Sequence, residues 1–208
     1  MTNKEKAKKV ISILKKRYGK EIPLYLNYHK NKPYEFLFAV MMSAQCTDKR
    51  VNIVTKDLYK KYDTLHKFAN VKQKELEIDI HSVGFYHNKA KNIIECAKTL
   101  ITDYKGKIPK VFDDLVKLPG VGRKTASVVI SRLYGIPAMA VDTHVARISN
   151  ILFNLNTKDV RVIEEYLKEI IDKKYWELWN THIIAIGREI CVARKPKCDI
   201  CPLYSLCK

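Results

Sequence analysis

Residues 118–126 read LPGVGRKTA, and this stretch joins two apolar helical segments through one proline and two glycines. Gly120 and Gly122 let the backbone turn with positive φ and approach a neighbouring element without an intervening Cβ. The next helix begins at Arg123 or Lys124, where unpaired backbone N–H groups carry a partial positive charge. An ordinary helix–helix turn needs only one glycine. The two glycines and the basic residues beside them therefore favour an anion-binding turn, and a DNA phosphate is the natural ligand.

Short apolar segments on both sides of this turn indicate a chain built of helices. Apolar residues recur every three to four positions in five segments, namely 33–45, 51–62, 91–104, 123–135 and 145–155. Prolines stand near segment boundaries, at positions 23, 33, 109, 119 and 137. Strand-like alternation, low-complexity tracts and glycine–serine linkers are absent. The pattern predicts an all-α protein whose helices are joined by tight turns.

The composition indicates a polyanionic partner. Lysine and arginine number 39 and aspartate and glutamate 22, which gives a formal net charge of +17. This positive charge favours binding to a nucleic acid. The alternative is that the lysine-rich surface only keeps the protein soluble. The N-terminus has no apolar signal core, and no run reaches the roughly 18 apolar residues of a membrane span. We therefore expect a soluble cytoplasmic protein without disulfides, with Cys46 and Cys96 as small core residues.

Four cysteines near the C-terminus follow the pattern C-x6-C-x2-C-x5-C; they are Cys191, Cys198, Cys201 and Cys207. Four thiolates in one short segment are typical of a zinc site or an iron–sulfur cluster. Short zinc sites usually contain two C-x2-C pairs, whereas only Cys198 and Cys201 form one here. The wider spans favour the bulkier cluster. The first span also contains three cations, which predict a second contact with phosphates: Arg194, Lys195 and Lys197.

Two turns of the chain share a short repeated sequence pattern. GFYHNKA at 84–90 and GVGRKTA at 120–126 both place a glycine turn six residues before an alanine in an apolar helix. The pair predicts two helix–turn–helix units in one helical layer.

Together these motifs resemble the endonuclease III family of DNA repair glycosylases. LPGVGRKTA is similar to the family's helix–hairpin–helix, and SAQCTD (43–48), GFYHNKAKNI (84–93), AVDTHVAR (140–147) and the cysteine segment follow in the family's order. The resemblance implies two helical lobes with a DNA-binding cleft between them. One lobe is a bundle over 23–136 that carries the hairpin. The other comprises 1–22 plus 137–208 and holds a [4Fe–4S] cluster on the four cysteines.

The resemblance also implies the reacting groups. Lys124 matches the family's nucleophile, whose amine displaces the damaged base and forms a Schiff base that permits elimination of the phosphate. The helix N-terminus and nearby arginine are expected to favour the uncharged amine. Asp142 matches the catalytic aspartate; its position also predicts an N-cap, and the helix end keeps the carboxylate ionised. His144 and Asp48 are candidate lesion-pocket residues.

Access to a base inside a duplex requires a side chain that fills the vacated space. By resemblance, Gln45 enters that space, and Phe85 is an apolar wedge between bases. Many relatives have leucine at the wedge position and alanine at the position of Cys46. Without the resemblance, Gln45 reads as a surface residue and Phe85 as a core residue.

The expected function is a bifunctional DNA glycosylase and AP lyase that excises oxidised pyrimidines from duplex DNA. The enzyme is expected to act as a monomer on damaged bases and abasic sites, in association with the nucleoid and not with a membrane. One alternative is an adenine glycosylase of the same superfamily, but those enzymes generally lack the hairpin lysine and carry an extra C-terminal domain. The other is a non-catalytic iron–sulfur protein that binds DNA without lesion preference.

Overall fold

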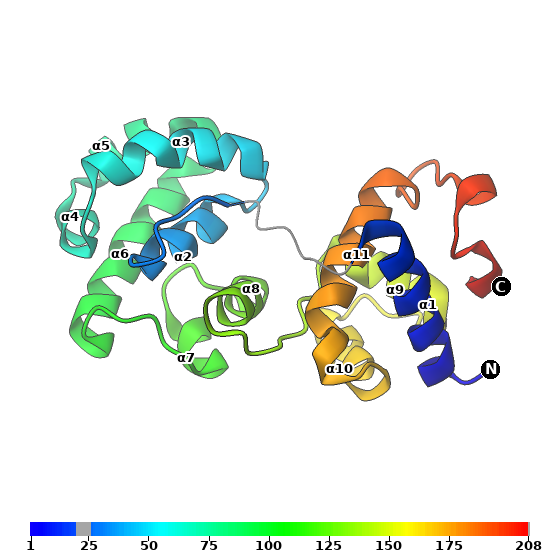
Figure 1. Cartoon of the computed structure of the whole chain (residues 1–208). Coiled ribbons are helices and arrows are strands. Elements are labelled where there is room, and N and C mark those ends of the chain that lie inside the picture. Colours follow the sequence, from blue (N-terminus) through cyan, green and yellow to red (C-terminus); the bar gives the residue numbers. More distant parts are fainter. Residues whose placement is uncertain (20–25, 208) are drawn as a thin grey trace. The chain divides into compact units, whose positions relative to one another are not determined.

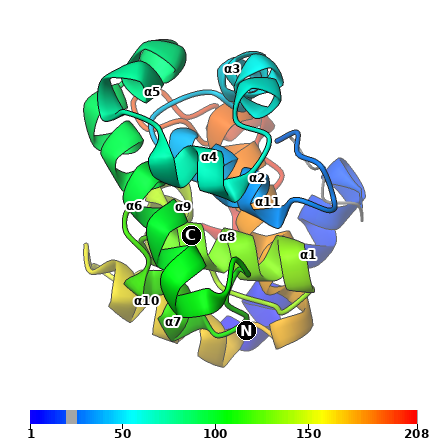
Figure 2. The same cartoon turned by 90° about the vertical axis from the view of Figure 1, so that its left-hand side faces the viewer.

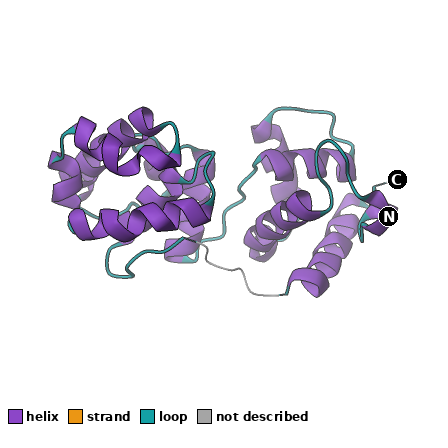
Figure 3. Ribbon diagram, turned by 90° about the horizontal axis from the view of Figure 1, so that it is seen from above, coloured by secondary structure: helices purple, strands orange, loops and turns teal. Residues whose placement is uncertain are grey.

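The structure, a computed structural model, describes residues 1–19 and 26–207 and contains only helices, turns and loops within them (Figures 1 and 3). The helices are α1 (Asn3–Tyr18), α2 (Pro33–Met42), α3 (Asp48–Lys61), α4 (Leu65–Asn70), α5 (Gln73–Ile80), α6 (Tyr86–Tyr104), α7 (Phe112–Lys117), α8 (Arg123–Tyr134), α9 (Thr143–Phe153), α10 (Val160–Ile170) and α11 (Trp176–Glu189). The all-α prediction is confirmed. Pro23, one of the expected boundaries, lies outside the described residues. No helix in the described part is long and apolar enough to cross a membrane.

The chain divides into two compact units. Unit 1 comprises Met1–Ile22 and Ile136–Lys208, and unit 2 comprises Pro23–Gly135. Residues from both ends of the chain therefore belong to unit 1, whereas unit 2 is one continuous segment.

The centre of unit 2 is α2, which packs against α3, α6 and α8 (Figure 2). Pro33 starts this helix at a position where its missing N–H costs nothing, because the first N–H groups of a helix have no intrahelical acceptor. Every residue from Tyr34 to Met42 is buried. A helix that is apolar on all sides belongs inside a core, and this one supports the loop that follows it.

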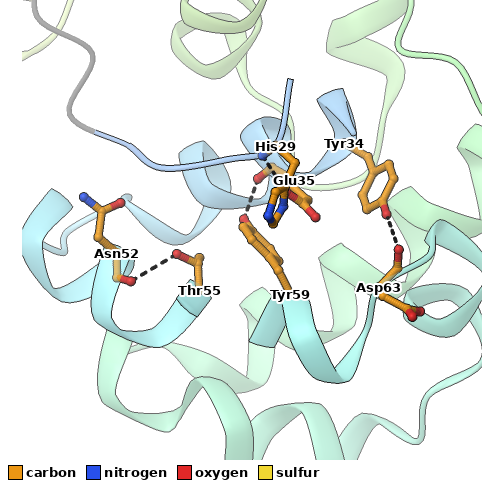
Figure 4. Close-up of polar contacts among 7 residues, drawn as sticks. All are labelled: His29, Tyr34, Glu35, Asn52, Thr55, Tyr59 and Asp63. Atoms are coloured by element: carbon orange, nitrogen blue, oxygen red, sulfur yellow. Dashed lines mark hydrogen bonds and ion pairs between the residues drawn. The ribbon is translucent and has the colours of Figure 1, made fainter. Parts of the chain in front are cut away.

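Glu35 of α2 bonds through its buried carboxylate to the segment before the helix and through its backbone carbonyl to α3 (Figure 4). Glu35 has no solvent exposure, and its Oε2 accepts a hydrogen bond from the His29 backbone N–H at 2.8 Å and lies 2.7 Å from His29 Nδ1. The Tyr59 hydroxyl of α3 donates to the Glu35 carbonyl oxygen at 2.5 Å. Burial raises the pKa of Tyr59, so this donor keeps its proton. The contacts fix the start of α2 against α3.

Unit 1 surrounds an apolar core shared by α1, α9, α10 and α11. Trp179 of α11 is almost fully buried and stacks against Phe153 of α9 with 6.0 Å between ring centroids. Leu203 and Leu206, which lie among the last cysteines of the chain, are buried in the same core. The cysteine segment is therefore anchored by its own apolar residues.

The two cysteines outside that segment differ. Cys96 is fully buried in α6, as expected, and burial raises the pKa of its thiol to about 12. Cys46 is only half-buried, in the loop between α2 and α3, so its assignment to the core was wrong. The turn after α2 directs residues 44–47 outward, away from the apolar environment of that helix.

A buried histidine makes the stability of unit 1 dependent on pH. His182 of α11 is 3% exposed, its Nε2 has no hydrogen-bond partner among the described residues, and burial lowers its pKa. The unfolded chain binds a proton here at a pKa of about 6.5 and the folded protein binds it only at lower pH. The unfolded state thus holds more protons below that value, and the free energy of unfolding falls as the pH decreases.

We expect His182→Leu to remove this dependence. Between pH 7 and pH 5, the wild type should lose more unfolding free energy than the variant, by at most about 1.4 kcal/mol per pH unit. Denaturant unfolding at both pH values measures the difference, and His81→Leu, at an exposed position, is the matched control. Parallel pH curves for wild type and His182→Leu would contradict the assignment.

Candidate active site and nucleic-acid interface

The hairpin before α8 has one glycine in the left-handed region rather than the two that the sequence suggested. Gly120 has a φ of +73°, whereas Gly122 has a φ of −82° and an extended backbone. The Val121 N–H donates to the Leu118 carbonyl oxygen at 3.0 Å and closes the turn. Gly122 is the N-cap, and α8 begins at Arg123, one of the two predicted starts. Gly122 is needed here only for its small size, because its conformation suits any residue.

Close packing makes Gly120 hard to replace. A Cβ at this position would lie 2.7 Å from Asn92 Cβ of α6 and 2.9 Å from Met41 Cε of α2. At Gly122 a Cβ would meet no heavy atom within 4 Å. The first glycine of the hairpin thus packs against α2 and α6, and the second glycine is open to an incoming ligand.

These two glycines provide a matched pair of variants. We expect Gly120→Ala to lower the free energy of unfolding by about 2–3 kcal/mol, because it adds both a positive-φ strain and a steric clash. Gly122→Ala should cost less than about 1 kcal/mol, yet weaken DNA binding because a methyl group stands where a phosphate would approach. Thermal unfolding and DNA titration of both variants measure the two effects. Equal stability losses would contradict this division of roles.

Lys124 is the second residue of α8 and is exposed. The first backbone hydrogen bond of the helix runs from the Ala126 N–H to the Gly122 carbonyl oxygen at 2.9 Å, so the preceding N–H groups point out of the helix. Arg123 is half-buried, and its guanidinium lies 5.0 Å from the centroid of the Phe112 ring. Lys124 is therefore an exposed residue at a helix N-terminus, next in the chain to an arginine that packs on Phe112.

Three loops that were predicted to contact DNA line one cavity of unit 2. The cavity has a volume of about 260 Å³, and its lining includes Gln45, Phe85 and Gly120. Gln45 and Phe85 both have left-handed backbones, with φ of 54° and 48°. Phe85 is 65% exposed, which excludes its reading as a core residue. The fold thus gathers loops that are far apart in the chain.

The two turns that share this sequence pattern also share a backbone conformation. Gly84 and Gly120 have φ of +70° and +73°, and each precedes a helix of unit 2, α6 and α8 respectively. Both glycine turns therefore present a helix N-terminus.

Three residues that line this cavity were not predicted from the sequence, and one predicted residue of unit 2 lies outside it. Lys89, Asn88 and Asn92 of α6 also line the cavity, and their only sequence signal is the helical spacing behind Phe85. Asp48 starts α3 and lines a different hollow of about 420 Å³, so it is not part of the Gln45 cavity.

In unit 1, Asp142 is the N-cap of α9, as expected. Its Oδ1 accepts hydrogen bonds from the backbone N–H groups of His144 and Val145, both at 2.9 Å. These donors and the helix N-terminus stabilise the carboxylate anion. The His144 side chain lies against α11, where a Cβ on Gly187 would come 2.7 Å from His144 Nδ1. Gly187 permits this approach, and no sequence pattern marked it.

The four cysteines of the C-terminal segment influence one another. Burial raises the pKa of Cys207, and the charges of Cys201, Cys191 and Cys198 raise it further. Arg147 of α9, which sequence reasoning missed, donates from Nη1 to Cys191 Sγ at 3.4 Å. Within residues 1–19 and 26–207, no group of three or more His, Cys, Asp or Glu side chains is placed to hold a metal ion. Four cysteine thiols in one neighbourhood are nevertheless the donor set that an iron–sulfur cluster takes.

The cations of the first cysteine span, Arg194, Lys195 and Lys197, are all exposed. They follow the end of α11 in a loop whose Lys197 N–H donates to the Ile190 carbonyl oxygen at 3.0 Å. The loop therefore returns to the helix that anchors it.

Comparison with known proteins agrees with both the hairpin of unit 2 and the cysteine segment of unit 1. Residues 38–173 match the HhH-GPD superfamily of base excision DNA repair proteins, and residues 191–207 match the iron–sulfur binding domain of endonuclease III. Endonuclease III of Bacillus subtilis is 49% identical over 86% of this chain and 82% of its own length. The enzyme of Escherichia coli is 36% identical over 86% of this chain and 84% of its own length.

Two solved structures have the same fold. A non-covalent endonuclease III–DNA complex is 44% identical, covers 100% of this chain and 96% of the other, and has a TM-score of 0.91. A trapped endonuclease III–DNA covalent intermediate, also 44% identical, covers 100% and 97% with a TM-score of 0.92.

A helix–hairpin–helix unit and a four-cysteine segment in one chain define a base excision DNA repair protein with an iron–sulfur domain. This chain belongs to the endonuclease III family. It is a bifunctional DNA glycosylase and AP lyase that binds DNA, and its cofactor is a [4Fe–4S] cluster. The family assignment made from the sequence is confirmed.

Proposed function

We propose that Lys124 is the nucleophile of this enzyme and that Asp142 is its carboxylate partner, acting on oxidised pyrimidines and abasic sites in duplex DNA. The observation that carries the proposal is the position of Lys124, an exposed residue in the first turn of α8, two residues after the open Gly122 N-cap. A phosphate held on the hairpin would bring a deoxyribose next to this amine.

The chemistry follows from an amine that attacks the sugar. The Lys124 Nζ bonds to C1′ while the bond from C1′ to the damaged base breaks, and the base leaves with a proton. Opening of the ring gives a Schiff base, which acidifies the hydrogen on C2′. Loss of that proton and cleavage of the C3′–O bond release the 3′ phosphate, and water then hydrolyses the imine and frees the lysine.

Asp142 has two tasks in this scheme. Its carboxylate, which accepts hydrogen bonds from two backbone N–H groups, stabilises the oxocarbenium-like sugar. It also accepts the proton that the lysine amine loses on attack. His144, two residues further on, and Asp48 of unit 2 are proposed to line the lesion pocket.

The cavity of unit 2 supports a role in extrusion of the base. Gln45 fills the space that the extruded nucleotide leaves, and its amide bonds to the orphaned base. Phe85, on the other loop, stacks between neighbouring bases. Both side chains are exposed at the rim of the same cavity, beside the hairpin.

We propose that Cys191, Cys198, Cys201 and Cys207 hold the [4Fe–4S] cluster. When bound, the cluster cross-links the segment, and its role here is structural. The exposed Arg194, Lys195 and Lys197 then form a second phosphate contact on a fixed loop. We further propose that the enzyme works as a monomer at the nucleoid, because its substrate is DNA.

Cleavage of three duplexes, compared side by side, tests the proposed substrate class. Strand scission is expected with thymine glycol and with a plain abasic site but not with undamaged DNA, and borohydride should trap a covalent complex with the first two. Excision of adenine opposite oxidised guanine without strand scission would instead identify an adenine glycosylase. Equal binding of all three duplexes without cleavage would identify a non-catalytic DNA-binding protein.

A further inference from the structure

A buried lysine links the two loops that present Gln45 and Phe85. Lys89, the fourth residue of α6, is 7% exposed. Its Nζ donates to the carbonyl oxygens of Met42 at 2.9 Å, Ala44 at 2.8 Å and Val83 at 2.9 Å. An ammonium has three N–H donors, so the three acceptors use all of them.

These acceptors lie where two different loops begin, at the end of α2 and just before Gly84. Met42 and Ala44 lead directly to Gln45, and Val83 leads through Gly84 to Phe85. The Lys89 backbone N–H also donates to the Phe85 carbonyl oxygen at 3.1 Å. Lys89 therefore bonds to the backbone just before Gln45 and Phe85, and also to the backbone of Phe85 itself.

Both wedge residues need such support. Gln45 and Phe85 have φ of 54° and 48°, in the left-handed region that is strained for a non-glycine residue. Such conformations persist where the surroundings fix them, and they gather at functional sites. The ammonium is bonded to carbonyl groups that precede each of these strained positions by no more than three residues.

The charge on Lys89 is not explained by an ion pair. No Asp or Glu among the described residues pairs with this ammonium, and burial lowers its pKa. An unpaired charge in a protein interior is strongly unfavourable, and this one stands near a helix N-terminus, where a cation is disfavoured. What the lysine provides in return is three donors aimed at carbonyl groups of two loops, which no apolar side chain can supply.

We propose that Lys89 is a positioning residue for base extrusion: its ammonium fixes the spacing between the Gln45 and Phe85 loops so that both side chains enter the duplex together. This inference rests on the proposed wedge role of those two residues. Lys89 itself lines the cavity between them, and its ammonium is directed to backbone carbonyls. It acts on DNA only through the loops.

The test uses the fact that extrusion is needed in a duplex but not in a single strand. We expect Lys89→Met, of similar length but without donors, to cleave an abasic site in duplex DNA about 10–100-fold more slowly than the wild type, with most of the loss in KM. Cleavage of the same abasic site in a single strand should stay within about 2-fold. Lys98→Met, at an exposed lysine of the same helix, is the matched control and should change neither rate.

Further readouts separate this role from fold stability and from the chemistry. A Lys89→Met/Phe85→Ala double variant should lose little more duplex activity than Phe85→Ala alone, because both changes disable the same wedge. Should Lys89→Met not fold, Lys89→Gln keeps two donors and carries the same comparison. Equal losses on both DNA forms, or no loss on either, would overturn the proposal. Borohydride trapping by Lys89→Met on the single strand stays intact if only the wedge fails, whereas its loss would place Lys89 in the chemistry and overturn the proposal. The nucleophile assignment is tested separately, by trapping with a Lys124 variant.

Discussion

Replacement of Lys124 with methionine is expected to abolish covalent trapping on abasic DNA and to slow strand cleavage by about 10⁴-fold or more. Loss of a nucleophile removes the covalent pathway, and only binding and electrostatic contributions remain. Lys124 is exposed in the first turn of α8, so the variant should unfold at nearly the wild-type temperature. Single-turnover cleavage of an abasic duplex and trapping with borohydride measure the effect.

A second lysine near the hairpin provides the control. Lys117 of α7 is also exposed, and its ammonium pairs with Asp114 at 2.8 Å. Lys117→Met removes the same charge from the same region and should retain trapping and most of the cleavage rate. Trapping that survives in Lys124→Met at the wild-type yield would remove Lys124 from the nucleophile's role.

The second large effect is expected at Asp142, where the charge of the carboxylate can be separated from its capping role. Asparagine keeps an oxygen that accepts from the His144 and Val145 N–H groups, so Asp142→Asn should leave the free energy of unfolding nearly unchanged. It removes the negative charge that stabilises the developing sugar cation. We therefore expect the rate of base excision to fall by about 10²–10³-fold.

Asp142→Ala completes the comparison. This variant loses both the charge and the cap, so it should show the same catalytic loss and, in addition, about 1 kcal/mol of destabilisation. Denaturant unfolding and single-turnover excision of thymine glycol, measured on both variants, give the two quantities. If Asp142→Asn excises the base at the wild-type rate, Asp142 is a helix cap and nothing more.

Features set by local chemistry could be predicted from the sequence. Pro33 begins α2, Asp142 caps α9 and Gly120 turns with positive φ, because each depends on a few neighbouring residues. The resemblance extended this reading to the family and its cofactor. Gly122 was wrongly grouped with Gly120, since an extended glycine and a left-handed one are the same letter in a sequence.

Features set by long-range packing could not be predicted. Lys89 meets carbonyl groups that precede it by 47 and 45 residues, and its sequence neighbourhood resembles any basic amphipathic helix. Gly187 likewise looks like an ordinary helical glycine until the His144 ring is placed against it. The exposure of Cys46 depends on where the turn after α2 directs the chain, which hydrophobicity alone does not give.

The burial of Leu203 and Leu206 bears on the life cycle of the cofactor. These side chains hold the C-terminal cysteine segment to the apolar core of unit 1 through contacts that do not involve the cluster. A protein molecule stripped of its inorganic core by oxidants should consequently keep a docking frame ready for reassembly. Maturation would then deliver iron and sulfide to a segment that apolar packing already holds at two of its residues.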